Sequence, residues 1–322
     1  MSFERRGNEY REALFVKREA KDEIRFTRYE RRTMRSLTLK SPAKLNLYLN
    51  ILRKRADGTH DIETLFERIN LFDRVTLTKI PSGIRITSNQ KEIPLDASNL
   101  AVRAAQKVLR KRGKGFGVHI HLKKRIPIAA GLGGGSSNAA TVLLGLNRLF
   151  HLRLSQKALL TIGRSLGADV PFFLLETPFA VGQERGDVVT PIRSPLKLIH
   201  LVVNNRVKVY TKEVYQQANF TLTRERRNVK IFQHFVERGD VTGLIDNCYN
   251  ALEAPAAKAH PSISKVKKIL KAFGLKGVTL SGSGATCFGF ADNLSQARTI
   301  CKRLSKKYRW DVFICRTYSS SG

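Results

Sequence analysis

PIAAGLGGGSSNAA, residues 127–140, is the segment that decides the fold. It follows residues 117–122, which alternate as a strand does, and leads into residues 139–149, which favour a helix. Its four glycines allow the backbone to approach a ligand closely, and a helix start offers unpaired N–H groups and a positive dipole end. The order strand, loop and helix therefore predicts a polyphosphate-binding loop. We expect Ser136 and Ser137 at the N-cap, where a hydroxyl caps the helix, binds a phosphate oxygen or ligates magnesium.

Two familiar phosphate loops do not fit this segment. A Walker A loop requires a Gly-Lys pair, and this loop contains no lysine. A Rossmann fingerprint has glycine where Ser136 stands, and it expects an acidic residue about 20 residues further on, which is missing here. A plain strand-to-helix turn is the remaining structural explanation, but such a turn rarely needs four glycines and two serines together.

The composition indicates a globular chain. Of its 322 residues, 42% are hydrophobic, which is enough for one large or two smaller cores. No apolar run has the length of a membrane span or the form of a secretory signal, so we expect a cytoplasmic protein that does not enter membranes. The four cysteines lack the spacing of a metal site or a disulfide framework, and we expect buried, reduced thiols.

The formal net charge of +32 would attract any polyanion. The basic residues are spread over many predicted elements, however, and no known RNA- or DNA-binding motif accompanies them. Segments 107–114 and 302–307 predict basic helix faces that bind nucleic acid only weakly and with strong salt dependence. We therefore expect no sequence-specific nucleic-acid binding, and the size of the charge has no explanation in the sequence.

The order of predicted elements indicates an α+β protein. Residues 1–33 form a charged extension that we expect to be dispensable, and a second methionine, Met34, follows it. Domains are expected over residues 34–205 and 206–322. Predicted strands cover 37–52, 74–80, 83–87, 179–181 and 198–203; predicted helices cover 100–110, 155–165, 229–237 and 262–273; a strand, loop, helix and strand close the chain within 277–315.

Three further segments carry candidate chemistry. Lys44 and Asn46 fall on one strand face and would address a ligand jointly, unless Lys44 is simply a solvated lysine. Asp169, within LGADVPFF, is a lone carboxylate among small and apolar residues, suited to orient or deprotonate a hydroxyl, or else to cap a helix. LSGSGAT, residues 280–286, is a second glycine-rich turn that can close over the same phosphates.

The segments SPAKLNLYLN, PIAAGLGGGSSNAA, LGADVPFF and LSGSGATCFGF, in this order, resemble the GHMP kinase superfamily. RADGTHDIETLF, residues 55–66, is similar to the signature of one family within it, the 4-diphosphocytidyl-2-C-methyl-D-erythritol kinases. The resemblance extends from Met34 to the C-terminus. It implies a two-domain GHMP kinase fold, with an α/β N-terminal domain of ribosomal-protein type and a ferredoxin-like α+β C-terminal domain.

The resemblance implies transfer of the ATP γ-phosphoryl group to the 2-hydroxyl of 4-diphosphocytidyl-2-C-methyl-D-erythritol, giving ADP, in the non-mevalonate isoprenoid pathway. Asp169 would act as the base, with Lys44 beside it to stabilise charge. Asn99 would contact the nucleotide, and Ser137 would ligate Mg²⁺. The remaining expected ATP contacts are Pro127, Ile128, Ala129, Ala130, Gly131, Leu132, Gly133, Gly134, Gly135, Ser136, Ser137, Gly282, Ser283 and Gly284.

For the acceptor, the resemblance implies that His60 contacts cytosine and that Asn46 and Asp169 lie near the erythritol end. This chain has Thr59 where the family has tyrosine before that histidine, which removes an aromatic surface, and base stacking is worth ~1 to 3 kcal/mol in nucleic-acid sites. Tyr210 is the candidate for a compensating aromatic residue.

Other interpretations stay open at this point. Another GHMP kinase acting on mevalonate, homoserine or a sugar would share these motifs, and a basic nucleic-acid-binding protein on the same fold is a further alternative. The retention of both Lys44 and Asp169 favours an enzyme. His119 and His121 share a strand face, but no carboxylate adjoins them, so a structural role is expected. The sequence leaves both a monomer and a homodimer open.

Overall fold

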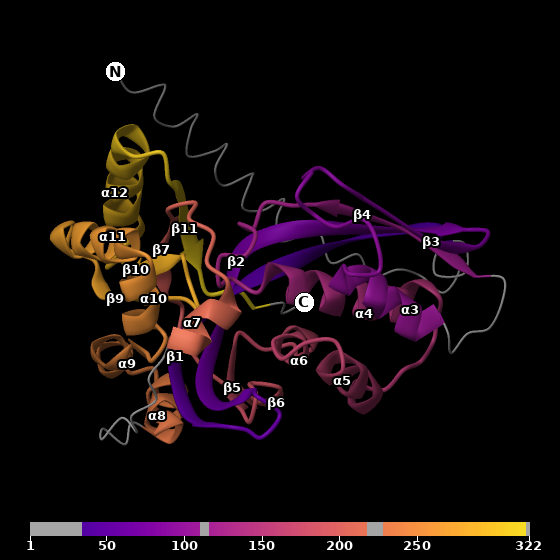
Figure 1. Ribbon diagram of the computed structural model, residues 1–322, viewed down its shortest axis with the longest axis horizontal. Coiled ribbons are helices and arrows are strands. Elements are labelled where there is room, and N and C mark those ends of the chain that lie inside the picture. Colours follow the sequence, from indigo (N-terminus) through magenta and orange to yellow (C-terminus); the bar gives the residue numbers. More distant parts are fainter. Residues whose placement is uncertain (1–33, 110–115, 218–227, 320–322) are drawn as a thin grey trace. The chain divides into compact units, whose positions relative to one another are not determined.

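Two long antiparallel strands, β1 (Ser36–Lys54) and β2 (His60–Ile80), form the centre of the larger sheet in the computed structural model of this protein (Figure 1). The structure describes residues 34–109, 116–217 and 228–319. Residues 41–51 of β1 are buried on both faces, although a strand with one wet face would alternate in exposure. The hydrophobic run from Leu45 to Ile51 therefore belongs to a strand that is covered on both sides.

The larger sheet has the order β3, β4, β2, β1, β8, and a hairpin of β5 and β6 pairs with β2. Strand β4 runs antiparallel to β2 and leads into the glycine loop, so the sheet fixes where that loop begins. The bounds of the other strands are β3 (Gly83–Ser88), β4 (Gly117–Lys123), β5 (Phe179–Gln183), β6 (Val188–Ile192) and β8 (Tyr249–Asn250).

Helix α4 (Gly134–Leu149) follows the glycine loop and packs on β1 and β2. Gly145 allows this close packing, because a Cβ atom there would overlap the side chain of Leu77. Helices α3 (Leu100–Leu109) and α6 (Val170–Leu174) pack against α4, and α5 (Gln156–Arg164) packs against α6 (Figure 1). The rigid sheet and α4 together hold the two ends of the glycine loop.

The second sheet has the order β11, β7, β10, β9. Its strands are β7 (Ile199–Asn204), β9 (Lys276–Leu280), β10 (Cys287–Phe290) and β11 (Asp311–Arg316). The helices of this half are α7 (Thr211–Gln217), α8 (Val229–Arg238), α9 (Val241–Asn247), α10 (Glu253–Ala259), α11 (Pro261–Ala272) and α12 (Leu294–Lys307).

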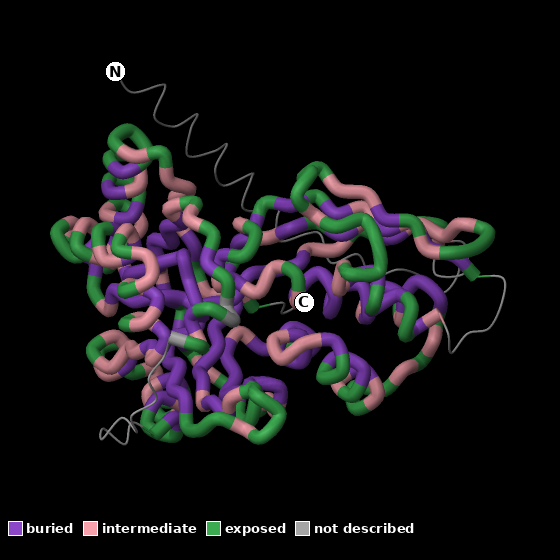
Figure 2. The backbone as a smooth tube through the Cα atoms, in the orientation of Figure 1, coloured by how far each residue is buried: buried purple, intermediate pink, exposed green. Residues whose placement is uncertain are grey.

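The two faces of the second sheet serve two cores, as the period of two in a strand requires. Val202 faces a core shared with the larger sheet, whereas Leu201 and Val203 face a core formed with α11 and α12. Buried residues fill the region where the strands of the two sheets lie together (purple in Figure 2). After β11 the chain returns to β2, where Thr317 forms a bridge with Ile69.

The predicted α+β class and most predicted elements are confirmed, with two corrections. Helix α4 begins at Gly134, with Gly133 at the N-cap, so the expectation that Ser136 and Ser137 form the N-cap is wrong; both lie in the first turn. Strand β2 begins at His60 rather than near residue 74. The expected extension, residues 1–33, lies outside the described residues. The domain division near residue 205 stays a prediction, since Ser36–Ser320 group as one compact unit.

Candidate active site

A cleft of about 640 Å³ brings the separate motifs together. Its walls come from β1, the start of α3, the glycine loop, the segment around Asp169, residues 209–215 and the second glycine turn. The predicted site residues that line it are Lys44, Asn46, Asn99, Pro127, Ile128, Ala129, Ala130, Gly131, Leu132, Gly133, Gly134, Gly135, Ser136, Asp169, Tyr210, Gly282 and Ser283. Ser137, Gly284 and His60 are not among the residues that line it.

The glycine loop is clamped between β1 and the second glycine turn. The amide of Lys44 donates a hydrogen bond to the carbonyl of Leu132 at 3.0 Å, and the Ser281 hydroxyl donates to the carbonyl of Gly131 at 3.0 Å. Gly131 has φ +77°, and a Cβ there would overlap the carbonyl oxygen of Ser281. Only glycine combines this backbone conformation with this close approach. The two loops thus form one wall of the cleft.

A buried polar network supports the loop from behind. Asp73 at 0% exposure forms an ion pair with Lys124 and accepts hydrogen bonds from the backbone amides of Arg125 and Ile126. The Asn138 side chain donates to Asp73 and accepts from Lys124 at 2.9 Å. A buried charge is tolerated only when it is paired and hydrogen-bonded, and this network meets both conditions. The network ties the end of β2 to the entry and the first turn of α4.

Ser137 belongs to this network rather than to the cleft. Its hydroxyl is fully buried and lies 2.8 Å from the hydroxyl of Ser41, which also accepts a hydrogen bond from Asn138. Ser136, one residue earlier, lines the cleft. Among the described residues, no group of three His, Cys, Asp or Glu side chains lies close enough to hold a metal ion. The magnesium role expected of Ser137 therefore gains no support from this geometry.

Lys44 and Asp169 face each other across the cleft. The Lys44 ammonium lies 3.7 Å from a carboxylate oxygen of Asp169, with side-chain exposures of 4% and 32%. Burial lowers the pKa of Lys44, and the negative charge of Asp169 opposes that shift. Asp169 occupies the N-cap position of α6, yet its side chain makes no capping hydrogen bond. Its carboxylate therefore lies beside Lys44 in the cleft and does not cap the helix.

Asn46 holds Lys44 in place. Its side-chain oxygen accepts a hydrogen bond from the Lys44 ammonium, and its amide nitrogen donates to the Thr64 hydroxyl at 2.8 Å. Thr64 in turn donates to the carbonyl of Tyr48 at 2.7 Å, which fixes the direction of the whole chain of hydrogen bonds. The predicted proximity of Lys44 and Asn46 is confirmed, and Thr64 is a partner that the sequence reasoning missed.

Asn99 combines a structural task with its place in the cleft. Its side-chain oxygen accepts from the amide of Ala101 at 2.9 Å, which caps α3, and its nitrogen donates to the carbonyl of Pro94 at 2.8 Å. The second glycine turn is held by Asn250, whose amide donates to the carbonyls of Leu280 and Gly282, each at 2.8 Å. A Cβ at Gly282 would lie 3.4 Å from the Lys44 ammonium, so this turn reaches the Lys44–Asp169 pair.

The other end of the cleft is aromatic. The His60 ring lies against the Tyr215 ring, with centroids 4.8 Å apart, and Tyr215 lines the cleft. Burial is the main cause that raises the pKa of Tyr215 to about 12, and the negative charge of Asp169 adds to it. Burial, followed by the charge of Lys54, lowers the pKa of His60. Tyr215 therefore connects the His60 end of the cleft with the Asp169 end.

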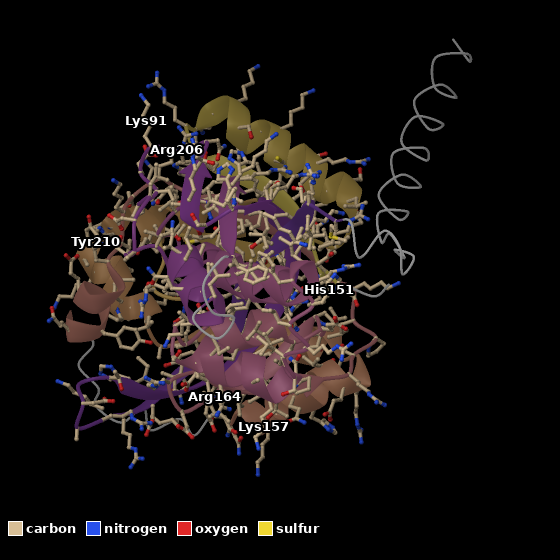
Figure 3. All side chains as sticks on the ribbon, turned by 90° about the vertical axis from the view of Figure 1, so that its right-hand side faces the viewer. Lys91, His151, Lys157, Arg164, Arg206 and Tyr210 are labelled. Atoms are coloured by element: carbon tan, nitrogen blue, oxygen red, sulfur yellow. The ribbon has the colours of Figure 1, made fainter. Side chains whose placement is uncertain are left out.

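Tyr215 is a second residue that the sequence reasoning missed. Tyr210, the aromatic residue that we expected there, also lines the cleft, but it is 59% exposed and lies at the edge of the molecule (Figure 3). Thr59 uses its hydroxyl to donate to Asp57 in the β1–β2 turn. The available signal for Tyr215 was a second tyrosine in the segment where Tyr210 was the expected aromatic residue.

His119 and His121 have the expected structural role. Both rings hydrogen-bond to the Thr87 hydroxyl, at 2.9 and 3.0 Å, on the exposed side of the β3–β4 pair. All four cysteines are free; Cys287 and Cys315 are buried, as expected, whereas Cys248 and Cys301 are only partly buried. Among the described residues, none of the helices is both long and apolar enough to span a membrane.

Comparisons with known proteins agree with this geometry. Residues 99–177 match the GHMP kinases N terminal domain family, and residues 232–309 match the GHMP kinases C terminal family. A 4-diphosphocytidyl-2-C-methyl-D-erythritol kinase of Alkaliphilus metalliredigens is 38% identical over 89% of this chain and 98% of its own length. One from a Geobacter species is 40% identical over 88% of this chain and 100% of its own.

Solved structures of GHMP kinases are also similar to this chain in fold. A crystal structure of 4-(cytidine 5'-diphospho)-2C-methyl-D-erythritol kinase superposes with a TM-score of 0.74 at 34% identity, covering 88% of this chain and 100% of that one. A homoserine kinase from Cytophaga hutchinsonii superposes with a TM-score of 0.72 at 20% identity, covering 92% of this chain and 98% of that one. The second similarity shows that the fold is shared with kinases of other acceptors.

Proposed function

This chain belongs to the 4-diphosphocytidyl-2-C-methyl-D-erythritol kinase family of GHMP kinases, and we propose that it transfers the γ-phosphoryl group of ATP to the 2-hydroxyl of that substrate. The products are ADP and the 2-phosphate, within the non-mevalonate route to isoprenoid precursors. The observation that carries the proposal is the Lys44–Asp169 pair, which lies in the same cleft as the glycine loop and the aromatic pocket.

The nucleotide end of the cleft follows from backbone geometry. The start of α4 offers unpaired amides and a positive dipole end toward the cleft, and the glycine residues let phosphates approach them. Phosphoryl transfer depends mainly on positioning and electrostatic stabilisation, so a rigid loop is an advantage. The buried Asp73–Lys124 pair and the contact with Ser281 supply that rigidity.

At the reacting end, Asp169 accepts or orients the proton of the attacked hydroxyl. Lys44 stays close to Asp169 because Asn46 and Thr64 hold its ammonium in place. Its positive charge stabilises negative charge that develops on the transferred group and on the attacking oxygen. With both of its amide atoms engaged by the protein, Asn46 acts as a positioning residue for Lys44.

At the acceptor end, Tyr215 lines the cleft and offers a stacking surface for cytosine, with the His60 ring packed behind it. Tyr215 thereby compensates for the aromatic surface lost at Thr59. Tyr210, at the exposed edge of the cleft, would contact the same base from outside. Mevalonate, homoserine and galactose lack a base to fill this surface, so the pocket favours the cytidylated acceptor.

The residues at the reacting end fit magnesium. Mg²⁺ is commonly held by one or two carboxylates, waters and substrate phosphates rather than by a full protein cage. Asp169 and the hydroxyl of Ser136 are among the oxygen-bearing side chains of the described cleft, and they would complete such a set. Bound magnesium would neutralise phosphate charge. We also place the enzyme in the cytoplasm, where its nucleotide substrates are found.

The test is ADP release by the purified protein with ATP and magnesium, compared across 4-diphosphocytidyl-2-C-methyl-D-erythritol, mevalonate, homoserine and galactose. Selective turnover of the cytidylated acceptor is expected. Turnover of another acceptor at a higher kcat/KM would keep the kinase mechanism but refute the substrate, and absence of turnover with all four would refute the kinase assignment.

A further inference from the structure

A dense group of exposed cations outside the cleft lies on α12 and the residues around it. We call it the α12 face and define it by seven exposed cations, namely Lys268, Lys271, Lys302, Arg303, Lys306, Lys307 and Arg309. The sequences of α11 and α12 contain no Asp or Glu. In the part of the chain that the structure describes, none of these seven cations forms a salt bridge. Nitrogen-tipped side chains project outward from α12, the yellow helix at the top of Figure 3.

The arrangement of this face works against helix stability. Lys302 and Lys306 are four residues apart, and so are Arg303 and Lys307, and like charges at this spacing repel. Some other cations of the same half are paired, such as Lys276 with Asp292 at 2.8 Å and Lys267 of α11 with Glu253. The fold needs only the buried stripe of α12, which Ala297, Ile300 and Leu304 provide. The exposed cations therefore serve something other than folding.

Aromatic contacts join the cations into one surface. The Arg303 guanidinium lies 5.4 Å from the centre of the Phe273 ring at the end of α11, which links the two helices. The Lys307 ammonium lies 5.7 Å from the centre of the Tyr308 ring, and that ring stacks on Trp310 with centroids 4.1 Å apart. Cations four residues apart in α12 are separated by about 6 Å along the helix axis. A row of spaced cations next to aromatic rings is the pattern of a single-stranded nucleic-acid site.

The catalytic cleft does not account for this surface. None of the residues that line the cleft belongs to α11, α12 or segment 308–310. A membrane is the less suitable partner, because an interfacial helix buries large apolar side chains, and none of the exposed large hydrophobic side chains of the described residues lies on these elements.

We propose that the α12 face binds the phosphate backbone of single-stranded nucleic acid, without sequence preference and independently of catalysis. Binding by cations on a flat, open surface is dominated by counterion release and therefore weakens steeply with salt. If four of these cations contact phosphates, affinity for a single strand falls about 50-fold between about 50 and 200 mM salt. Nucleic-acid binding also gives a role to part of the excess positive charge of the chain, which ATP binding does not require.

The test is fluorescence anisotropy of labelled oligouridine of about 20 nucleotides, longer than a single such site, titrated with the full-length protein at several salt concentrations. The test variant carries K302E, R303E, K306E and K307E. The matched control carries R85E, K157E, R193E and K230E, which reverse the same number of exposed cations on other elements. Both variants are assayed for kinase turnover, which reports folding because none of these residues lines the cleft.

The expected result is at least a tenfold loss of oligouridine affinity in the test variant, with little change in the control and normal turnover in both. Equal losses in both variants would show a general attraction to net charge and overturn the site. Absence of binding by the unaltered protein at low salt would overturn it as well. Tighter, α12-dependent binding to vesicles of phosphatidylserine than to oligouridine would assign the face to membranes and refute the proposal.

Discussion

Replacing Gly131 by alanine tests the joint wall of the cleft most directly. The added Cβ would lie 2.0 Å from the carbonyl oxygen of Ser281, so the two loops must part by about 1.4 Å to reach an ordinary contact at 3.4 Å. The residue must also keep φ +77°, which costs a non-glycine residue roughly 1 to 2 kcal/mol. Because a displacement of about 1 Å in a positioned site can reduce rate 10²-fold, we expect kcat/KM for ATP to fall by about that factor.

The matched control is Gly83→Ala at the start of β3. Gly83 has φ +75°, nearly that of Gly131, but nothing lies within 4 Å of the Cβ that alanine would add. This variant should lose the same roughly 1 to 2 kcal/mol of stability, seen as a lower Tm, and keep its turnover. If Gly131→Ala loses no more activity than Gly83→Ala, the glycine loop is not held by the second turn, and the reasoning fails.

Three further predictions concern the reacting groups and the acceptor pocket. Asp169→Asn should lower kcat by about 10² to 10⁴-fold at unchanged Tm. The control Asp240→Asn, which alters the capping aspartate of α9, should leave kcat unchanged. Near-normal turnover of Asp169→Asn would refute the role of Asp169 as the base. Burial lowers the pKa of Lys44, and the proposed mechanism needs its charged form, so activity should fall as pH rises through that lowered pKa. In Lys44→Arg the alkaline fall of the kcat profile should move to higher pH, because the guanidinium stays charged. An unmoved profile would exclude Lys44 as the source of the fall. Tyr215→Ala should raise KM for the cytidylated acceptor about tenfold or more and leave KM for ATP unchanged, whereas Tyr215→Phe should leave both KM values unchanged. A rise in KM for ATP instead would place ATP, and not the acceptor, at this pocket.

The sequence was sufficient for features that depend on local chemistry. Alternation along β1 and the glycines of residues 131–135 predicted the strand and the loop. It misplaced the start of α4, because glycine is a poor helix former and three consecutive glycines were interpreted as loop. In the structure, Gly134 and Gly135 are helical, since packing of the following residues on β1 and β2 outweighs their low propensity.

Features that depend on partners far apart in the chain were not predictable. Asn46 was correctly placed beside Lys44, but the direction of its amide is set by Thr64 on the neighbouring strand. The spacing of residues within one segment cannot reveal such a partner. Tyr215 was overlooked for the same reason, because its role comes from contact with His60, which lies in β2, in a different part of the chain.

The closure of the glycine loop by the second turn also has a consequence for synthesis on the ribosome. Ser281 and Gly131, which join the two loops, are 150 residues apart. At the usual speed of about 5 to 20 residues per second, roughly 8 to 30 seconds pass between their synthesis. During that interval the nascent chain carries every glycine of the loop but lacks the wall that completes it. Any stabilisation that bound ATP provides through the complete wall therefore reaches the chain only after Ser281 has been synthesised.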